Sequence, residues 1–427
     1  MIESVVAVFL ISMALFLPFK WAYSISLATS YSLFYYLIAD IATLMFVILF
    51  LRLAFKQGLT KGLKNRLFQN HILLVGLSIL TLLWASQIDL GISIVFAQLK
   101  VLFIALVSLQ IIEEKRDLRY VIYGAVAGAF YICICLTGWK FGLFGISSSE
   151  YQANINQYGR LLVQYFFTGR NTPINSNTWS ALASLSSILG AVYYFYIIPK
   201  PKKFHKVIIL CLVLLVIAIT SDLGSRGALL AILAGVVLLF YPIPPKRFYT
   251  YALWLIILFY AGAITLDLIA QLLPEGNEIL QSRLNESAEN EDARFQIWLT
   301  GLNMAMNNFI TGVGIGNGGV RFKEYMVYDF HNTRLAMHNS FLTHFAELGI
   351  FGLILFVRGM YLWQKPFIFQ RSTKVLLVVV SMNILINAFA HSFELENYFI
   401  AIIYSVHAYF LLEMKEAKKI QNQVLNK

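Results

Sequence analysis

Apolar blocks constrain this chain more than any other feature of its sequence. They run for about 17 to 25 residues each, which is enough for a helix rising about 1.5 Å per residue to cross a hydrocarbon core of about 30 Å. A stretch such as VIILCLVLLVIAIT, residues 207–220, lacks the alternation of apolar and polar residues found in membrane barrel strands. Because a spanning segment must satisfy its own backbone hydrogen bonds, the blocks are predicted to be helices.

Composition supports a membrane protein rather than a soluble one. Of the 427 residues, 59% are hydrophobic and 13% are charged, against about 45–50% and about 25% in soluble domains. The first block follows only Met1, Ile2 and Glu3, without a basic leader, so it is expected to be a retained helix. The sequence thus predicts an all-α polytopic membrane protein, a single integral membrane domain over residues 1–427.

About twelve transmembrane helices are expected from the charges, prolines and glycines that bound the blocks. They are predicted near residues 3–18, 30–51, 70–86, 92–112, 119–137, 177–198, 207–221, 226–241, 249–272, 338–360, 373–391 and 397–413. Two connections between them are long, at residues 138–176 and 273–337. The second precedes the tenth helix and contains a predicted amphipathic helix.

The distribution of Lys and Arg predicts the orientation. The loops on the side of the N-terminus hold most of these residues, whereas the short loops on the other side hold only Lys20 and Arg226. Since basic loops stay in the cytoplasm, both termini are predicted to be cytoplasmic and both long loops extracytoplasmic. The basic residues are spread over several short segments, which argues against a nucleic-acid-binding surface as the source of the +11 net charge.

Two arginines are candidates for binding an anion at the outer face. Arg226, in SDLGSRGALLAILAG, is predicted to begin a helix, where a guanidinium, unpaired backbone N–H groups and the helix dipole together suit a diphosphate. An interfacial arginine paired with Asp222 is the alternative. Arg294, in EDARFQIWLTGLNMAMNNF, lies on the predicted amphipathic helix, where it is either a ligand or part of a solvated face.

A glycine-rich segment, GVGIGNGGV at residues 312–320, matches the dinucleotide-binding fingerprint at Gly314, Gly316 and Gly319. The fingerprint requires a preceding strand and a βαβ unit, and an all-helical chain offers neither. We interpret the segment as a flexible turn that lets the long loop fold back over a site.

The segment MHNSFLTHFAELGIFGLILF, residues 337–356, is predicted to enter the tenth helix at the outer interface. A histidine such as His338, with a pKa near neutrality, can accept a proton from an attacking sugar hydroxyl, although an interfacial helix cap is the alternative. His344 lies on another helical face, within reach of Glu347. The spacing of His331, His338 and His344 matches no familiar zinc pattern, so neither a metal nor a cofactor is predicted.

Polar segments elsewhere on the outer side offer possible substrate-binding groups. The stretch GRNTPINSNTWSAL carries Arg170 and Asn177, and the turn before the last helix carries His391. Amides and arginines suit carbohydrate hydroxyls, but these residues can equally be loop and cap residues. Asn339, beside His338, belongs to the same group of candidates.

Three segments together carry a resemblance to a known family: GSRGALLA at a helix start, the Arg-containing and glycine-rich loop, and HNSFLTHFAELGIFG. The chain resembles the O-antigen ligase and polymerase superfamily, membrane glycosyltransferases that use undecaprenyl diphosphate. In the ligases, the motif runs from His and Asn through nine residues to two glycines and two threonines. His338, Asn339, Gly349 and Gly352 match that pattern, whereas Leu353 and Ile354 replace the threonines.

The resemblance implies a reaction and its partners. The donor would be a glycan linked to undecaprenyl diphosphate, and the acceptor a glycan or a lipid A core at the outer face of the bacterial inner membrane. It also implies that His338 activates the acceptor hydroxyl, while Arg226 and Arg294 hold the diphosphate. The missing threonine pair favours an O-antigen, capsule or exopolysaccharide polymerase over a ligase. A lipid-linked glycan flippase or transporter is the alternative from another class.

Overall fold

The computed structural model describes most of the apolar blocks and part of the loops. It describes residues 60–114, 117–141, 161–164, 171–174, 176–198, 200, 202–222, 225–240, 296–327, 337, 339–368, 380–381, 383–384, 386 and 397–425. The helices expected near residues 3–18, 30–51 and 249–272 lie outside these ranges.

Helices make up nearly all of the described chain. The elements are α4 (Thr60–Leu63), α5 (Arg66–Thr81), the 3₁₀ turn η1 (Leu82–Trp84), α6 (Ile88–Ile111), α7 (Leu118–Lys140), β1 (Leu161–Gln164), β2 (Asn171–Ile174), α9 (Ser176–Val192), the π-helical turn η3 (Tyr193–Ile197), α10 (Lys203–Asp222), α11 (Arg226–Phe240), the 3₁₀ turn η5 (Phe322–Tyr325), α14 (Ser340–Ile368) and α16 (Asn397–Leu425). Residues 296–307 form a further helix in the second long connection, as predicted. Helical residues also occur at 380–381, 383–384 and 386, inside the helix expected at 373–391.

Five of the described helices are long and apolar enough to cross a membrane. The candidate spans are Arg66–Trp84, Ile88–Ile111, Ser180–Ile197, Lys203–Ser221 and Ser340–Trp363. Each coincides with a helix predicted from the sequence. The chain is therefore a helical membrane protein.

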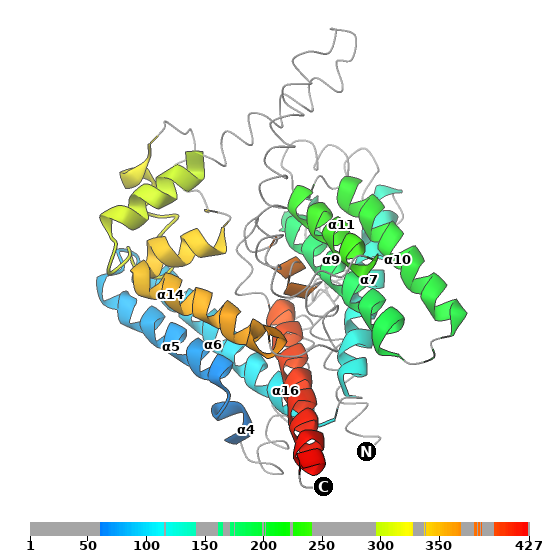
Figure 1. The fold of residues 1–427 in the computed structure, drawn as a ribbon. Coiled ribbons are helices and arrows are strands. Elements are labelled where there is room, and N and C mark those ends of the chain that lie inside the picture. Colours follow the sequence, from blue (N-terminus) through cyan, green and yellow to red (C-terminus); the bar gives the residue numbers. More distant parts are fainter. Residues whose placement is uncertain are drawn as a thin grey trace, which may run out of the picture.

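The helices form two groups with α16 between them (Figure 1). One group contains α5, α6 and α14, and the other contains α7, α9, α10 and α11. Helix α16 contacts α6 and α14 on one side and α7 on the other. Helix α9 packs against α7, α10 and α11. In the span Ser180–Ile197, which includes most of α9, 78% of the residues are buried. Its run of Ser, Ala and Gly explains this, because small residues let neighbouring helices approach closely.

The first long connection adds a short strand pair to the otherwise helical chain. There, β1 and β2 form an antiparallel pair in which Leu161 faces Ile174 and Gln164 faces Asn171. The first strand comes from LLVQ, whose short apolar run carries a strand signal that the prediction overlooked.

Several helix boundaries also differ from those predicted. Helix α5 begins at Arg66, four residues early, because the side chain of Asn65 caps it by accepting from Phe68 N at 3.1 Å. Helix α14 runs on to Ile368 and α16 to Leu425. Both continue past the apolar block that was used to predict their ends, because charged and amide side chains are compatible with a helix.

Candidate active site

Helix α14 begins immediately after the position predicted to be catalytic. Its cap is Asn339, whose Oδ1 accepts from Leu342 N at 3.1 Å and whose carbonyl accepts from both the N and Oγ1 of Thr343. Asn339 is buried, so this cap is fixed by packing as well as by hydrogen bonds. Both oxygen atoms of Asn339 therefore accept hydrogen bonds within the protein.

Helix α14 is broken at Gly349, which has φ +69° and ψ −167°. In an unbroken helix Ile350 N would donate to Ala346 O, but here it donates to Phe309 O at 2.8 Å. The break folds the first part of the helix back, and His344 stacks on Phe356 with ring centroids 4.4 Å apart. Figure 1 shows the bend in α14.

The glycine-rich segment fills the break. Val313 N donates to Ala346 O at 2.9 Å, and Gly314 N donates to Glu347 O at 3.0 Å. These are two of the carbonyls that the interrupted helix leaves without their usual partners. Gly312 has φ +65°, and a Cβ there would lie 2.3 Å from the Glu347 backbone, so only glycine fits.

The carboxylate of Glu347 holds the other end of the segment. Its Oε2 accepts from Gly316 N at 2.8 Å and its Oε1 from Gly318 N at 3.1 Å, while the residue is only 8% exposed. Backbone donors in a buried site bind a charged acceptor strongly. Glu347 was predicted to lie within reach of His344. In the structure, its carboxylate accepts hydrogen bonds from the glycine-rich segment.

A second anchor joins the segment to the turn between α5 and α6. The Oδ1 of Asn317 accepts from Ser86 Oγ at 2.8 Å and from Gln87 N at 2.7 Å, and Ile315 N donates to Thr81 Oγ1 at 3.1 Å. Asn317 is buried. The expectation of a flexible turn was wrong, because hydrogen bonds at both ends fix residues 312–318 between two membrane helices. A helix, at residues 296–307, precedes the segment.

The helix at residues 296–307 is tied to the residue before His338. The indole Nε1 of Trp298 donates to Met337 O at 3.0 Å, and Met337 itself is buried. Arg294 precedes Trp298 by four residues in the sequence. The hydrogen bond from Trp298 thus joins the helix at residues 296–307 to Met337.

Helix α11 begins at Arg226, as predicted. Ser225 is buried and caps the helix through its carbonyl, which accepts from Leu229 N at 2.9 Å. The backbone of Arg226 is therefore in the first helical turn, where N–H groups lack intrahelical partners. Helices α10 and α11 pack against each other on either side of this turn.

Several predicted site residues lie outside the described part of the chain. These are His338, Arg294, Arg170 and His391, together with the side chains of Arg226 and Asn177. The convergence of His338, Arg226 and Arg294 thus stays a prediction. Among the described residues, no group of three or more His, Cys, Asp and Glu residues gathers as a metal site would require.

Comparison with known families finds a similarity in the second half of the chain. Residues 222–357 match the family described as O-antigen ligase. This part of the chain is similar to the O-antigen ligase and polymerase superfamily. No curated protein matches the chain significantly.

The matched region contains the start of α11, the glycine-rich segment and the break in α14. It begins at Asp222, the end of α10, and ends at Val357, after the break in α14. The family motif's glycine at Gly349 is thus the residue at which α14 breaks. A Cβ at Gly349 would lie 2.2 Å from Ile310 O, which explains in physical terms why the motif requires glycine.

Sequence reasoning missed the roles of Glu347, Asn317 and Trp298. A buried Glu next to a glycine-rich loop is a weak signal, because it also occurs on solvated helix faces. The indole of Trp298 was assigned to an apolar face, and its N–H group was the overlooked sign that it needs an acceptor.

Proposed function

We propose that this protein is a glycan polymerase of the inner membrane that transfers a lipid-linked glycan to a sugar hydroxyl. The observation that carries the proposal is the fixed position of both neighbours of His338 inside the matched region. Met337 is buried and bonded to Trp298, and Asn339 is buried and caps α14. The chain is therefore fixed on both sides of position 338 at the start of α14, which supports a role for this segment in positioning a substrate.

The chemistry follows from the residue types. The acceptor hydroxyl oxygen attacks the anomeric carbon of the donor glycan, and the bond from that carbon to the diphosphate oxygen breaks. The hydroxyl proton passes to His338, and the bonding electron pair leaves with undecaprenyl diphosphate. Arg226 and Arg294 stabilise the negative charge that develops on this leaving group. The donor is already activated, so neither ATP nor a sugar nucleotide takes part.

A ligase is the second candidate, because the matched family is described as O-antigen ligase. It would share the donor and the site but would use a lipid A core or a protein as acceptor. The replacement of the threonine pair by Leu353 and Ile354 favours the polymerase.

Deletion of the gene separates the two functions. We expect the deletion strain to carry glycans of a single repeat unit, and we expect the wild-type gene to restore long chains. Long lipid-linked chains that accumulate without reaching their acceptor would instead indicate a ligase. Normal glycans of normal length in the deletion strain would contradict both functions.

A further inference from the structure

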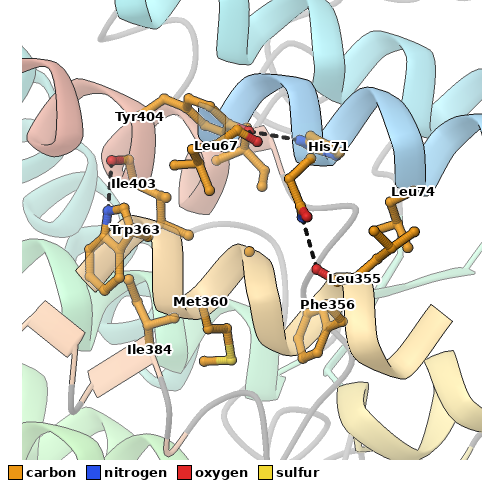
Figure 2. Close-up of a pocket in the computed structure, with 13 residues that line it drawn as sticks. Leu67, His71, Leu74, Leu355, Phe356, Met360, Trp363, Ile384, Ile403 and Tyr404 are labelled. Carbon is orange, nitrogen blue, oxygen red and sulfur yellow. Dashed lines mark hydrogen bonds between the residues drawn. The ribbon is translucent and has the colours of Figure 1, made fainter. Parts of the chain in front are cut away.

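A cavity lies between α5, α14 and α16, apart from the residues of the proposed transfer site. It has a volume of about 110 Å³ and is open on one side. Its walls are almost entirely apolar, as Figure 2 shows for Leu74, Met360 and Ile384. The α5 and α14 residues that line it belong to the candidate membrane spans Arg66–Trp84 and Ser340–Trp363.

One polar atom on this wall lacks a partner. Asn70 is only 3% exposed, and its Nδ2 donates to Leu355 O at 2.8 Å (Figure 2). Because a carbonyl accepts and does not donate, the bond fixes which end of the amide faces α14. The amide oxygen Oδ1 is then left without a donor among the described residues.

Two further features show that the wall is built around this amide. Gly359 leaves room for it, since a Cβ there would lie 3.2 Å from Asn70 Nδ2. The adjacent residue, His71, interacts with Tyr404. The Tyr404 hydroxyl lies 3.1 Å from Nδ1 of the imidazole, and the two rings are stacked. The Tyr404 hydroxyl in turn donates to Leu67 O at 3.4 Å. Among the fully buried side-chain nitrogen and oxygen atoms of the residues that line the cavity, the oxygen of Asn70 is the one without a hydrogen-bond partner.

A buried acceptor without a donor costs about 1–3 kcal/mol, so such groups call for an explanation. An apolar cavity among membrane helices is surrounded by hydrocarbon, and a wall with so few polar groups does not favour filling by water. A charged headgroup would find no opposite charge among the residues that line the cavity. The class of ligand that remains is a hydrocarbon chain that carries an uncharged hydrogen-bond donor.

We propose that the cavity between α5, α14 and α16 binds an uncharged long-chain alcohol, whose hydroxyl donates to Asn70 Oδ1. The chain of the alcohol packs against the aliphatic and aromatic lining. An isoprenoid alcohol and a diacylglycerol both have this chemistry. The residues that line the cavity do not include any of those proposed for glycan transfer, and the proposal does not depend on the transfer reaction.

Binding to the purified full-length protein in detergent tests the proposal. The probes are a radiolabelled isoprenoid alcohol, its methyl ether, its monophosphate and a diacylglycerol. We expect the alcohol to bind about tenfold more tightly than the ether, which keeps the chain but lacks the donor. Comparison of the isoprenoid alcohol with diacylglycerol identifies the source of the chain.

Variants then assign the binding to this wall. Asn70→Leu should remove the tenfold preference for the alcohol and leave the affinity for the ether unchanged. Gln98→Leu is the matched control, because Gln98 is another buried amide with an unpartnered oxygen, on α6 and outside the cavity lining. Met360→Trp should weaken both ligands by filling the cavity, without touching the amide.

Three outcomes would overturn the proposal. They are equal binding of alcohol and ether to the wild type, an unchanged preference in Asn70→Leu, and tighter binding of the monophosphate than of the alcohol. If Asn70→Leu does not fold, the comparison of alcohol with ether and the Met360→Trp variant still decide the question. None of these measurements uses glycan transfer, so failure here is distinct from failure of the proposed function.

Discussion

At the scale of single residues, Gly349 carries the largest structural consequence. Its φ of +69° is unfavourable for any other residue, and a Cβ would meet Ile310 O at 2.2 Å. We therefore expect Gly349→Ala to lower the free energy of unfolding by at least about 1–3 kcal/mol, and to lower the thermal midpoint of the purified protein accordingly. Size-exclusion chromatography after heating measures that midpoint.

Gly76→Ala is the control for this prediction. Gly76 lies inside α5, and a Cβ there would meet nothing within 4 Å, so alanine should be neutral or stabilising by up to about 1 kcal/mol. Equal midpoints for the two variants would contradict the role assigned to Gly349.

Glu347 provides a second prediction at this scale. Glu347→Ala leaves the Gly316 and Gly318 N–H groups without their acceptor in a buried site, at a cost of about 1–3 kcal/mol each. Glu324→Ala should cost less than about 1 kcal/mol, because its pair with Arg321 is exposed. A smaller loss of thermal stability in Glu347→Ala than in Glu324→Ala would contradict the anchoring role.

Residue-level prediction from sequence succeeded where a local signal exists and failed where the partner is distant. Arg226 at the start of α11 and Asn339 at the start of α14 were predictable, because helix caps and helix starts depend on residues that are adjacent in the sequence. The bonds from Asn317 to Gln87 and from Trp298 to Met337 join residues far apart in the sequence. No local pattern signals them.

At the scale of elements, the apolar blocks predicted the position of each of the five candidate membrane spans, but not its shape. The bend of α14 was missed because Gly349 sits inside an apolar run that is typical of a straight span. The fold-back depends on Val313 and Gly314, which replace the hydrogen bonds that the helix loses. A block of apolar residues indicates length and not straightness.

The bond from Trp298 to Met337 provides the prediction at this scale. Trp298→Phe keeps an aromatic ring but removes the donor, so the helix at residues 296–307 loses its tie to the residue before His338. We expect at least a severalfold loss of glycan transfer at a nearly unchanged thermal midpoint. Chain length on gels, with protein amount matched, measures the transfer.

Trp84→Phe is the matched control. Trp84 is 39% exposed on η1, and the same change there should leave transfer unaltered. Equal activity of Trp298→Phe and wild type would show that this bond does not help to position the site.

At the scale of the whole molecule, the predicted orientation in the membrane is open to test. The excess of Lys and Arg in alternate loops predicts a cytoplasmic C-terminus and an extracytoplasmic second long connection. Green fluorescent protein fused after Lys427 should fluoresce, and alkaline phosphatase fused within residues 273–295 should be active. An active phosphatase at Lys427 would reverse the orientation and place the site on the wrong side.

The central claim is that His338 takes the proton of the acceptor hydroxyl in transfer from a lipid diphosphate. Its most direct test is transfer by the purified full-length protein, supplied with lipid-linked glycan and acceptor but no nucleotide. We predict that His338→Ala lowers the rate at least about 100-fold, the contribution of a general base. His205→Ala, at the exposed start of α10, should retain the wild-type rate. Transfer by His338→Ala at the wild-type rate would contradict the account.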